Sequence, residues 1–227
     1  MTTPVRDDVK TVWLICVSLI GMKVERPHRP ADAPGTLPGD RSAAIRLAAL
    51  RLFATQGYRA TTMADIGAAV GIRGPSLYKH VSGKQVLLAE IMLGTMDALI
   101  ARHAEAVGSA DGVREQLRRA AEAHVRYHAR HQLEAFVGNR EIGSLEQPDR
   151  DRVLRRRSTY ERGFRKLIER GTAEGVFTPR STRLASYSIL DMGMGVSSWF
   201  HDGGEFSVDE LAYHYGDLAL RIAGGSA

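Results

Sequence analysis

Three histidines near the middle of the chain have the spacing of metal ligands on a helix. His124, His128 and His131 lie at positions i, i+4 and i+7, so one helical face could carry all three, and Glu141 could add a carboxylate. No cysteine accompanies them, however, and the sequence has no His-Glu-x-x-His motif. We therefore expect no metal and no cofactor. The favoured interpretation is a partly buried His128 hydrogen-bonded to Glu141, with a metal site as the alternative.

The common motifs of enzymes are absent from the sequence. It has no Gly-x-Ser-x-Gly nucleophile motif, no Gly-x4-Gly-Lys-Ser/Thr phosphate loop and no Gly-x-Gly-x-x-Gly motif after a strand. The expected function is not enzymatic, although a helical enzyme without a recognisable motif is an alternative. The single cysteine, Cys16, excludes an intrachain disulfide and fits a reducing compartment such as the cytoplasm.

The first 40 residues are expected to form a disordered or loosely packed arm. Residues 26–40 hold four of the eight prolines and cannot propagate a helix. Residues 12–20 are apolar, but they are too few to cross a bilayer, which takes about 20 residues. No membrane partner is therefore expected, and Met22 is an alternative start of the native protein.

Basic residues are concentrated in one segment. Seven lysines and arginines face two acidic residues between positions 41 and 90, so the whole formal net charge of +5 lies there. A basic segment joined to a neutral one indicates that the first part binds a polyanion, with a solvated cationic face as the alternative.

Three short helices between residues 41 and 84 would position these cations. Thr61 or Thr62 would cap the second helix, Gly71 would end it, and Pro75 suits the first turn of the third. Two short helices joined by a tight glycine-containing turn form a helix-turn-helix, in which the second helix enters the DNA major groove.

The third helix would present polar and basic groups to DNA. Leu77 and Val81 lie four residues apart and must share its buried face. Lys79, Lys84 and the Tyr78 hydroxyl could then reach phosphates, although similar geometry also occurs in helical bundles with no DNA role. The candidate DNA-binding residues are Thr61, Thr62, Arg73, Gly74, Pro75, Ser76, Tyr78, Lys79, His80 and Lys84.

The segment LFATQGYRATTMADIGAAVGIRGPSLYKHVSGK, residues 52–84, resembles the N-terminal domain of the TetR/AcrR family of bacterial transcriptional regulators. It departs from the family pattern at Gly67, Arg73 and Val81, and the first departure should weaken the second helix by up to about 1 kcal/mol. The positions that match are Phe53, Gly57, Tyr58, Thr61, Thr62, Ile66, Gly71, Leu77, Tyr78, His80 and Lys84.

Residues 85–224 predict six more helices, over 84–107, 113–131, a shorter piece through 136, 149–174 and two near the C-terminus. Apolar residues of the last two recur every three or four positions, which suits a self-pairing bundle or packing within one chain. The resemblance implies pairing of two copies through these helices. The candidate dimer-interface residues are Ile189, Val196, Leu211, Tyr215, Leu218 and Ile222.

The resemblance also implies a pocket for a small effector in this second domain. The segments NREIGSL and WFHDGGEFSVDELAYHYGDLAL are similar to an actinobacterial subgroup in which several members respond to acyl-coenzyme A thioesters. Methionines and aromatic residues at helical spacing are more often plain core, and that is the alternative interpretation of the candidates below. The candidate lining residues are Met92, Met96, Tyr127, His128, Phe136, Arg140, Met192 and Trp199.

The expected fold is all-α. It comprises an arm (1–40), a three-helix helix-turn-helix domain (41–84) and a six-helix ligand-binding and dimerisation domain (85–224). The expected function is a cytoplasmic, ligand-responsive transcriptional regulator, a repressor by resemblance. It would bind a pseudo-palindromic double-stranded DNA operator as a homodimer, and an apolar or acyl-CoA-type effector would release it. A DNA-binding regulator without an effector is the alternative.

Overall fold

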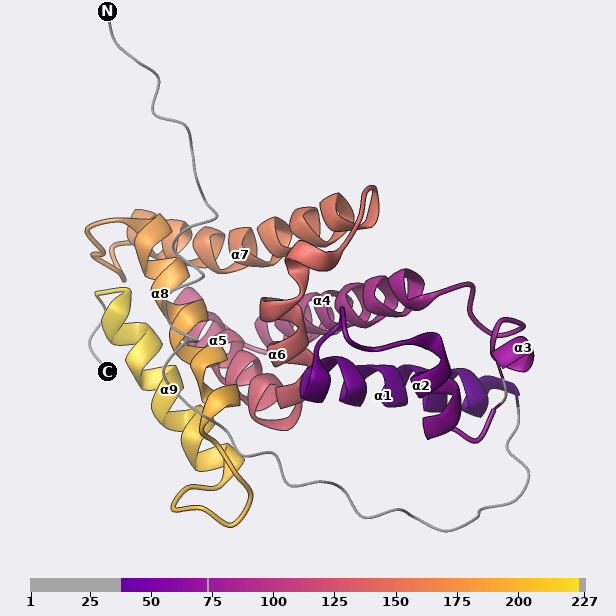
Figure 1. Ribbon diagram of the computed structural model, residues 1–227. Helices are drawn as coiled ribbons and strands as arrows, with labels where there is room; N and C mark the ends of the chain where they lie inside the picture. The colour runs from indigo at the N-terminus through magenta and orange to yellow at the C-terminus, as the bar shows by residue number, and fades with distance from the viewer. Residues whose placement is uncertain (1–37, 73, 225–227) are drawn as a thin grey trace, which may run out of the picture. The chain divides into compact units, whose positions relative to one another are not determined.

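The computed structural model describes residues 38–72 and 74–224 (Figure 1). Over these residues the chain forms nine α-helices and two short 3-10 helices, with no strand. This confirms the predicted all-α class and the division into three plus six helices. The arm predicted for residues 1–40 lies outside the described residues as far as Leu37, and the first helix already begins at Pro38.

The first three helices form the head of the protein: α1 (Pro38–Gln56), α2 (Met63–Ala69) and α3 (Gly74–Leu77). They share a small core in which Phe53, Ile66 and Leu77 are fully buried. α3 is shorter than predicted, but the Val81 N–H still bonds the Leu77 carbonyl at 3.2 Å. Both residues are buried, as their spacing indicated.

Gly67 in α2 has a packing reason. A Cβ added there would lie 2.7 Å from the Ile72 carbonyl oxygen in the turn that follows α2. The Ile72 N–H donates to the Gly67 carbonyl at 2.8 Å, so the turn folds directly against this position. The departure from the family pattern thus permits a closer turn rather than only weakening the helix.

The other six helices form the body. They are α4 (Lys84–Gly108), α5 (Val113–Arg130), α6 (Gln132–Arg140), α7 (Asp149–Ala173), α8 (Thr182–Gly195) and α9 (Val208–Ile222). α5 is the central helix, in contact with α4, α7, α8 and α9 (Figure 1). No helix among the described residues is long and apolar enough to cross a membrane.

α5 is central because most of its side chains are small or apolar on the faces that meet its neighbours. Leu117, Ala120, Ala121 and Val125 are buried along it. Gly193 of α8 lies against it so closely that an added Cβ would come within 2.4 Å of the ring of His124. Close packing of this kind fixes the helices that carry the groove described below.

Candidate nucleic-acid interface and ligand groove

Ser76 of α3 and the three residues that follow the helix have exposed side chains. Ser76, Tyr78, Lys79 and His80 are all exposed, and Tyr78 retains 56% of its accessible surface. None of their side chains hydrogen-bonds or pairs with another described residue. Because Leu77 anchors the segment in the core, these polar groups project together from the head. They have the composition and position of a DNA-contacting surface.

The two threonines of the head have structural roles instead. Thr61 is fully buried and its hydroxyl donates to the Gly57 carbonyl at 2.8 Å. The Thr62 hydroxyl accepts from the Asp65 N–H, while the Asp65 carboxylate accepts from the Thr62 N–H at 2.8 Å. This capping box starts α2, and it uses the hydroxyl that was predicted to contact DNA.

The Lys84 ammonium is also used within the head. It donates to the carbonyl oxygens of Tyr58 (3.0 Å), Thr61 (2.9 Å) and, more weakly, Arg59 (3.4 Å). It also lies 4.5 Å from the centre of the Tyr58 ring. Without DNA, the Lys84 ammonium is therefore engaged by these three carbonyls, and its contact with a DNA phosphate stays a prediction. These bonds tie the turn between α1 and α2 to Lys84, the first residue of α4.

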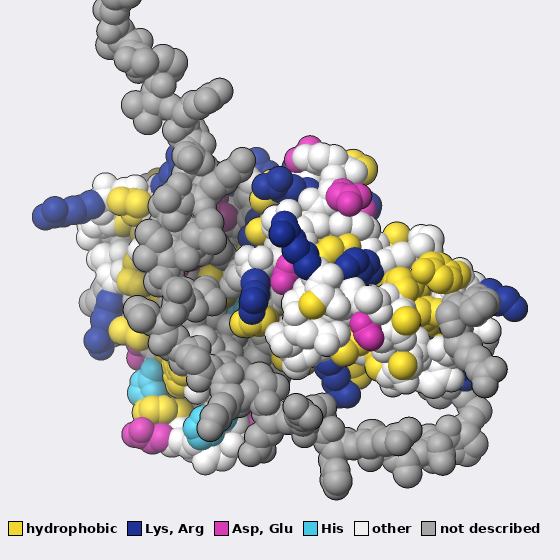
Figure 2. Space-filling view, in the orientation of Figure 1, with side chains coloured by type: hydrophobic (Ala, Val, Ile, Leu, Met, Phe, Trp, Pro, Cys, Tyr) yellow, Lys and Arg dark blue, Asp and Glu magenta, His cyan; other side chains and the backbone are white. Residues whose placement is uncertain are grey.

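Of three further predicted positions the structure describes no side chain. Arg73 lies outside the described residues. For Gly74 and Pro75 the structure describes only the backbone, which forms the start of α3. On the face in Figure 2, basic side chains are scattered among acidic ones rather than gathered in one band. On this face, surface charge therefore does not single out one region.

One joint connects the head to the body through Glu141, which follows α6 and is buried. Its carboxylate accepts from the Tyr58 N–H at 3.3 Å and from the Ser144 hydroxyl at 2.8 Å. The Ser144 carbonyl in turn accepts from the Gln85 side chain at 2.8 Å. Through these bonds, a displacement of α6 would move the end of α1.

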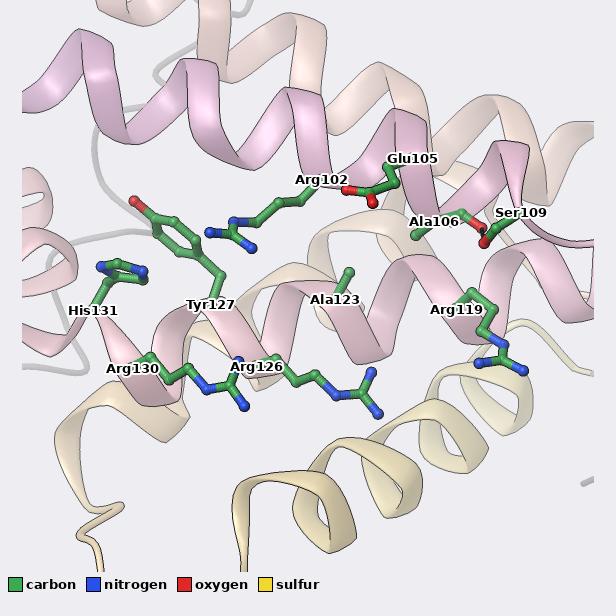
Figure 3. A pocket seen from close by; sticks show the side chains of 10 residues that line it. All are labelled: Arg102, Glu105, Ala106, Ser109, Arg119, Ala123, Arg126, Tyr127, Arg130 and His131. Atoms are coloured by element: carbon green, nitrogen blue, oxygen red, sulfur yellow. Dashed lines mark hydrogen bonds between the residues drawn. The ribbon is translucent and has the colours of Figure 1, made fainter.

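A groove of about 330 Å³ runs between α4 and α5 (Figure 3). α4 contributes Arg102 and Glu105 to it, and α5 contributes further arginines. Figure 3 shows the side chains of Arg119, Arg126 and Arg130 projecting from α5 toward the side on which α9 lies. The complete lining is Arg102, Glu105, Ala106, Ser109, Arg119, Ala123, Arg126, Tyr127, Arg130 and His131.

Only Tyr127 of the predicted effector residues lines this groove. Met92 and Met96 are buried in the hydrophobic core, whereas Trp199 is 48% exposed, so these three do not share a cavity. The guanidinium of Arg140 instead stacks on Phe136, at 5.6 Å. The spacing of these residues predicts which side of each helix they occupy. It does not distinguish a residue packed in the core from one that lines a cavity.

The histidines of α5 are buried among aromatic rings. His124 Nε2 donates to the Leu190 carbonyl and its Nδ1 accepts from the Tyr160 hydroxyl, both at 3.0 Å. His128 Nδ1 is buried without a hydrogen bond to any described residue, so the predicted bond to Glu141 is wrong. Burial lowers the pKa of His124 to about 4 and that of His128 well below its usual value. No group of residues in the described part of the chain has a metal-binding arrangement.

The predicted dimer seam is largely used within the chain. Ile189, Val196 and Leu211 are buried, because the inner faces of α8 and α9 pack on α5. Tyr215 and Ile222 are half-buried, as is Met192 of α8, which was predicted to line the effector pocket. Of the predicted seam only Leu218 is exposed, at 38%. Two other exposed apolar side chains of these helices were not predicted: Leu184 (66%) and Tyr213 (55%), the second with the Arg118 guanidinium of α5 at 5.5 Å from its ring.

Comparisons with known proteins agree on both parts of the chain. A profile of the family described as bacterial regulatory proteins, tetR family, matches residues 45–91. A profile described as tetracyclin repressor-like, C-terminal domain, matches residues 110–223. The HTH-type transcriptional repressor KstR2 of Rhodococcus jostii is 31% identical over 197 residues, covering 84% of this chain and 94% of the relative.

Solved structures show the same fold. A bacterial regulatory protein of the tetR family from Rhodococcus RHA1 is 30% identical with a TM-score of 0.76, covering 82% of this chain and 98% of that chain. The TetR family transcriptional regulator PfmR from Thermus thermophilus is 32% identical with a TM-score of 0.71, covering 78% of this chain and 97% of that chain.

Proposed function

The chain belongs to the TetR family of bacterial regulatory proteins, and from this premise we propose that it is a transcriptional repressor which binds a pseudo-palindromic operator as a homodimer. The observation that carries the proposal is the exposed segment Tyr78–His80. It is anchored by Leu77, and its polar side chains form no hydrogen bond or ion pair with another described residue. The relatives are regulators, so we propose no enzymatic activity, and we place the protein in the cytoplasm with its DNA.

Within this proposal the head residues divide into two groups. Ser76, Tyr78, Lys79 and His80 would contact DNA, together with Arg73 and the start of α3. Lys84 and the two threonines would hold the shape of the head that presents them.

A binding experiment with one matched control tests the DNA-reading role. Fluorescence anisotropy across a salt series would compare the wild type, Lys79→Ala and Lys166→Ala on the upstream intergenic DNA and on a scrambled sequence. Lys166 is an exposed lysine of α7 with no ion pair to another described residue. We expect Lys79→Ala to lose about 1–3 kcal/mol on the operator and less on scrambled DNA. Lys166→Ala should bind as the wild type does.

Two outcomes would count against this assignment. Equal losses of Lys79→Ala on both DNAs would mean that Lys79 contacts only the backbone. A wild type that binds both DNAs equally weakly would show that this head does not read the tested operator, and a genome-wide DNA pull-down would decide whether it reads another.

We propose that two copies pair through the outer faces of α8 and α9. The support is the exposed apolar side chains of these two helices, which include Leu184, Tyr213 and Leu218, since exposed apolar surface often marks an interface. Light scattering after gel filtration should give a monomer for Leu218→Glu. Leu154→Glu, at an equally exposed leucine of α7, should remain a dimer. A dimer in both variants would place the interface elsewhere.

We propose further that an apolar or acyl-CoA-type effector releases the DNA, with α6 as the element that carries the change. α6 begins next to His131, which lines the groove, and ends next to Glu141, which holds the head. An effector that binds better when α6 is displaced would bias the head toward a position unsuited to the operator. An operator complex insensitive to every effector tested would favour the alternative, a regulator without an effector.

A further inference from the structure

The groove between α4 and α5 is lined by four arginines and one acidic residue, Glu105. Of its four arginines, Arg119 pairs with Glu115 at 2.7 Å and Arg126 pairs with Glu122 and Asp209 at 3.0 and 2.7 Å. Arg102 and Arg130 are exposed and form no ion pair or hydrogen bond with any residue that the structure describes. Two guanidinium groups without an ion-pair partner among the described residues therefore border a concave surface, although Arg130 is near enough to Asp209 to lower the pKa of that carboxyl.

The shape of the groove follows from two short side chains. Ala106 of α4 and Ala123 of α5 lie between the arginines of the rim (Figure 3). Because neither side chain extends beyond Cβ, they leave room for a ligand to approach both helices. The only acidic residue in the lining is Glu105. The groove is thus open in the middle and cationic at its edges.

One side of the groove is held in place before any ligand arrives. The Tyr127 ring is buried between the His131 ring, stacked at 4.3 Å, and the guanidinium of Arg102, at 5.7 Å. Glu122, itself buried, fixes the Arg126 guanidinium at 3.0 Å. Preorganised arginines lose less conformational freedom when they bind an anion, so they are well suited to phosphate.

We propose that this groove binds the phosphate groups of a nucleotide-bearing effector, with Arg102 and Arg130 as the principal phosphate ligands and Arg126 as a third. This proposal rests on the proposed function and deepens it. It places the charged end of the effector in the groove, whereas the effector residues predicted from sequence were mainly apolar. An acyl chain would lie outside the groove, whose lining offers only Ala106, Ala123 and Tyr127 as apolar contacts.

The site has a built-in route to α9. Arg126 Nε donates to Asp209 in the first turn of α9, and this bond links α5 to that helix. A phosphate that draws Arg126 into the groove would compete with Asp209 for the same guanidinium. Binding would then weaken one contact between α5 and the helix proposed to meet the second copy.

The experiment is titration calorimetry of the full chain with three probes: coenzyme A, inorganic pyrophosphate and pantetheine, which lacks phosphate. The wild type should bind coenzyme A and not pantetheine. Arg102→Ala/Arg130→Ala should bind coenzyme A about tenfold or more weakly, because two charge-assisted contacts are lost. Pyrophosphate binding as tight as that of coenzyme A would show that free phosphates are recognised, and phosphate binding would then be the whole of the site's selectivity.

The matched control is Arg155→Ala/Arg221→Ala, which removes two exposed arginines from α7 and α9 and should bind coenzyme A within about twofold of the wild type. The proposal is overturned if coenzyme A does not bind the wild type, or if both double variants bind it equally. Operator binding without coenzyme A is measured in the same buffer. A wild type that fails there refutes the proposed repressor, whatever the groove binds. If instead Arg102→Ala/Arg130→Ala alone loses affinity for operator and scrambled DNA alike, the groove binds DNA and not an effector.

Discussion

Replacing Lys84 with alanine should loosen the head even in the absence of DNA. The ammonium of Lys84 donates to the carbonyl oxygens of Tyr58, Arg59 and Thr61 and lies over the Tyr58 ring. The substitution leaves these oxygens without their donor at the turn that joins α1 to α2. The turn should then open more often, and the exposed residues after α3 would be presented less uniformly to DNA.

The size of the effect follows from the exposure of the three bonds. A hydrogen bond to a charged group contributes about 1.5–3 kcal/mol where water is excluded. Lys84 is only partly buried, and one of its bonds is long, so the carbonyls would regain much of this from water. Together with about 0.5–1 kcal/mol for the contact with the Tyr58 ring, we expect a net loss of about 2 kcal/mol in the head. This corresponds to local opening that is about 30-fold more frequent.

Hydrogen exchange read by mass spectrometry measures that opening directly. Amides of residues 57–66 should exchange about 30-fold faster in Lys84→Ala, while those of α5 should be unchanged. Lys84→Met keeps the stem over Tyr58 and should show a smaller effect, and Lys166→Ala should show none. The salt dependence of operator binding should keep its slope.

The opposite pattern would refute this reasoning. If exchange in the head is unchanged in Lys84→Ala but the slope of log affinity against log salt falls by about one, Lys84 contacts a DNA phosphate. The hydrogen bonds to the carbonyls would then be of little consequence for the shape of the head.

Three further predictions concern the body and its joint to the head. Burial lowers the pKa of His103 and of His124 to about 4, below the value of 6.5 in the unfolded chain. As the pH falls, the unfolded chain therefore binds protons before the folded one does. The contribution of these neutral histidines to the free energy of unfolding is fully present above pH 6.5 and is lost as the pH falls toward 4. For each histidine, the free energy of unfolding should fall by up to about 1.4 kcal/mol per pH unit in that window. Urea titrations at pH 7, 6, 5 and 4.5 measure this, and a midpoint that does not change with pH would contradict it. Gly193→Ala should destabilise the protein by about 1–3 kcal/mol, because the added Cβ clashes with His124. Gly94→Ala has open space around it in α4 and should stabilise the protein by about 0.5–1 kcal/mol. Thermal melts in which both variants shift the melting temperature in the same direction would refute the packing argument. Glu141→Ala should cost about 1–3 kcal/mol because it strands a buried backbone N–H, and Glu141→Gln should cost less, as measured by denaturant unfolding; equal effects would argue against the hydrogen bond.

The order of the helices and the limits of the long ones could be predicted from sequence because they depend on local chemistry. The expected helix over 149–174 is observed as Asp149–Ala173, and the one over 113–131 as Val113–Arg130. The capping residues Ser207 and Glu210 likewise start α9 as their spacing indicates. Caps, glycine stops and apolar spacing act within a few residues, so one sequence is enough to find them.

The function of individual side chains could not be predicted in the same way. Lys84 reaches carbonyls more than twenty residues earlier in the chain, and Glu141 meets the Tyr58 N–H across 83 positions. The apolar repeat of α9 was visible, but a repeat does not tell which neighbour it packs on, and Leu211 faces α5 rather than a second copy. The arginine groove could not be located from the sequence, because its residues come from two helices whose mutual register only the fold sets. The one signal in the sequence was the recurrence of arginine along α5.

The bond between Tyr58 and Glu141 bears on how this protein could be recombined with its relatives. Its donor is a main-chain N–H, which every residue except proline supplies, whereas its acceptor is a side chain. A head from another family member grafted in place of residues 38–83 would therefore keep the joint, almost regardless of its own residue at that position. A foreign body without an acidic residue at the end of α6 would lose it. For this contact, heads can therefore be exchanged freely, and the residue at position 141 of the body decides whether head and body are compatible.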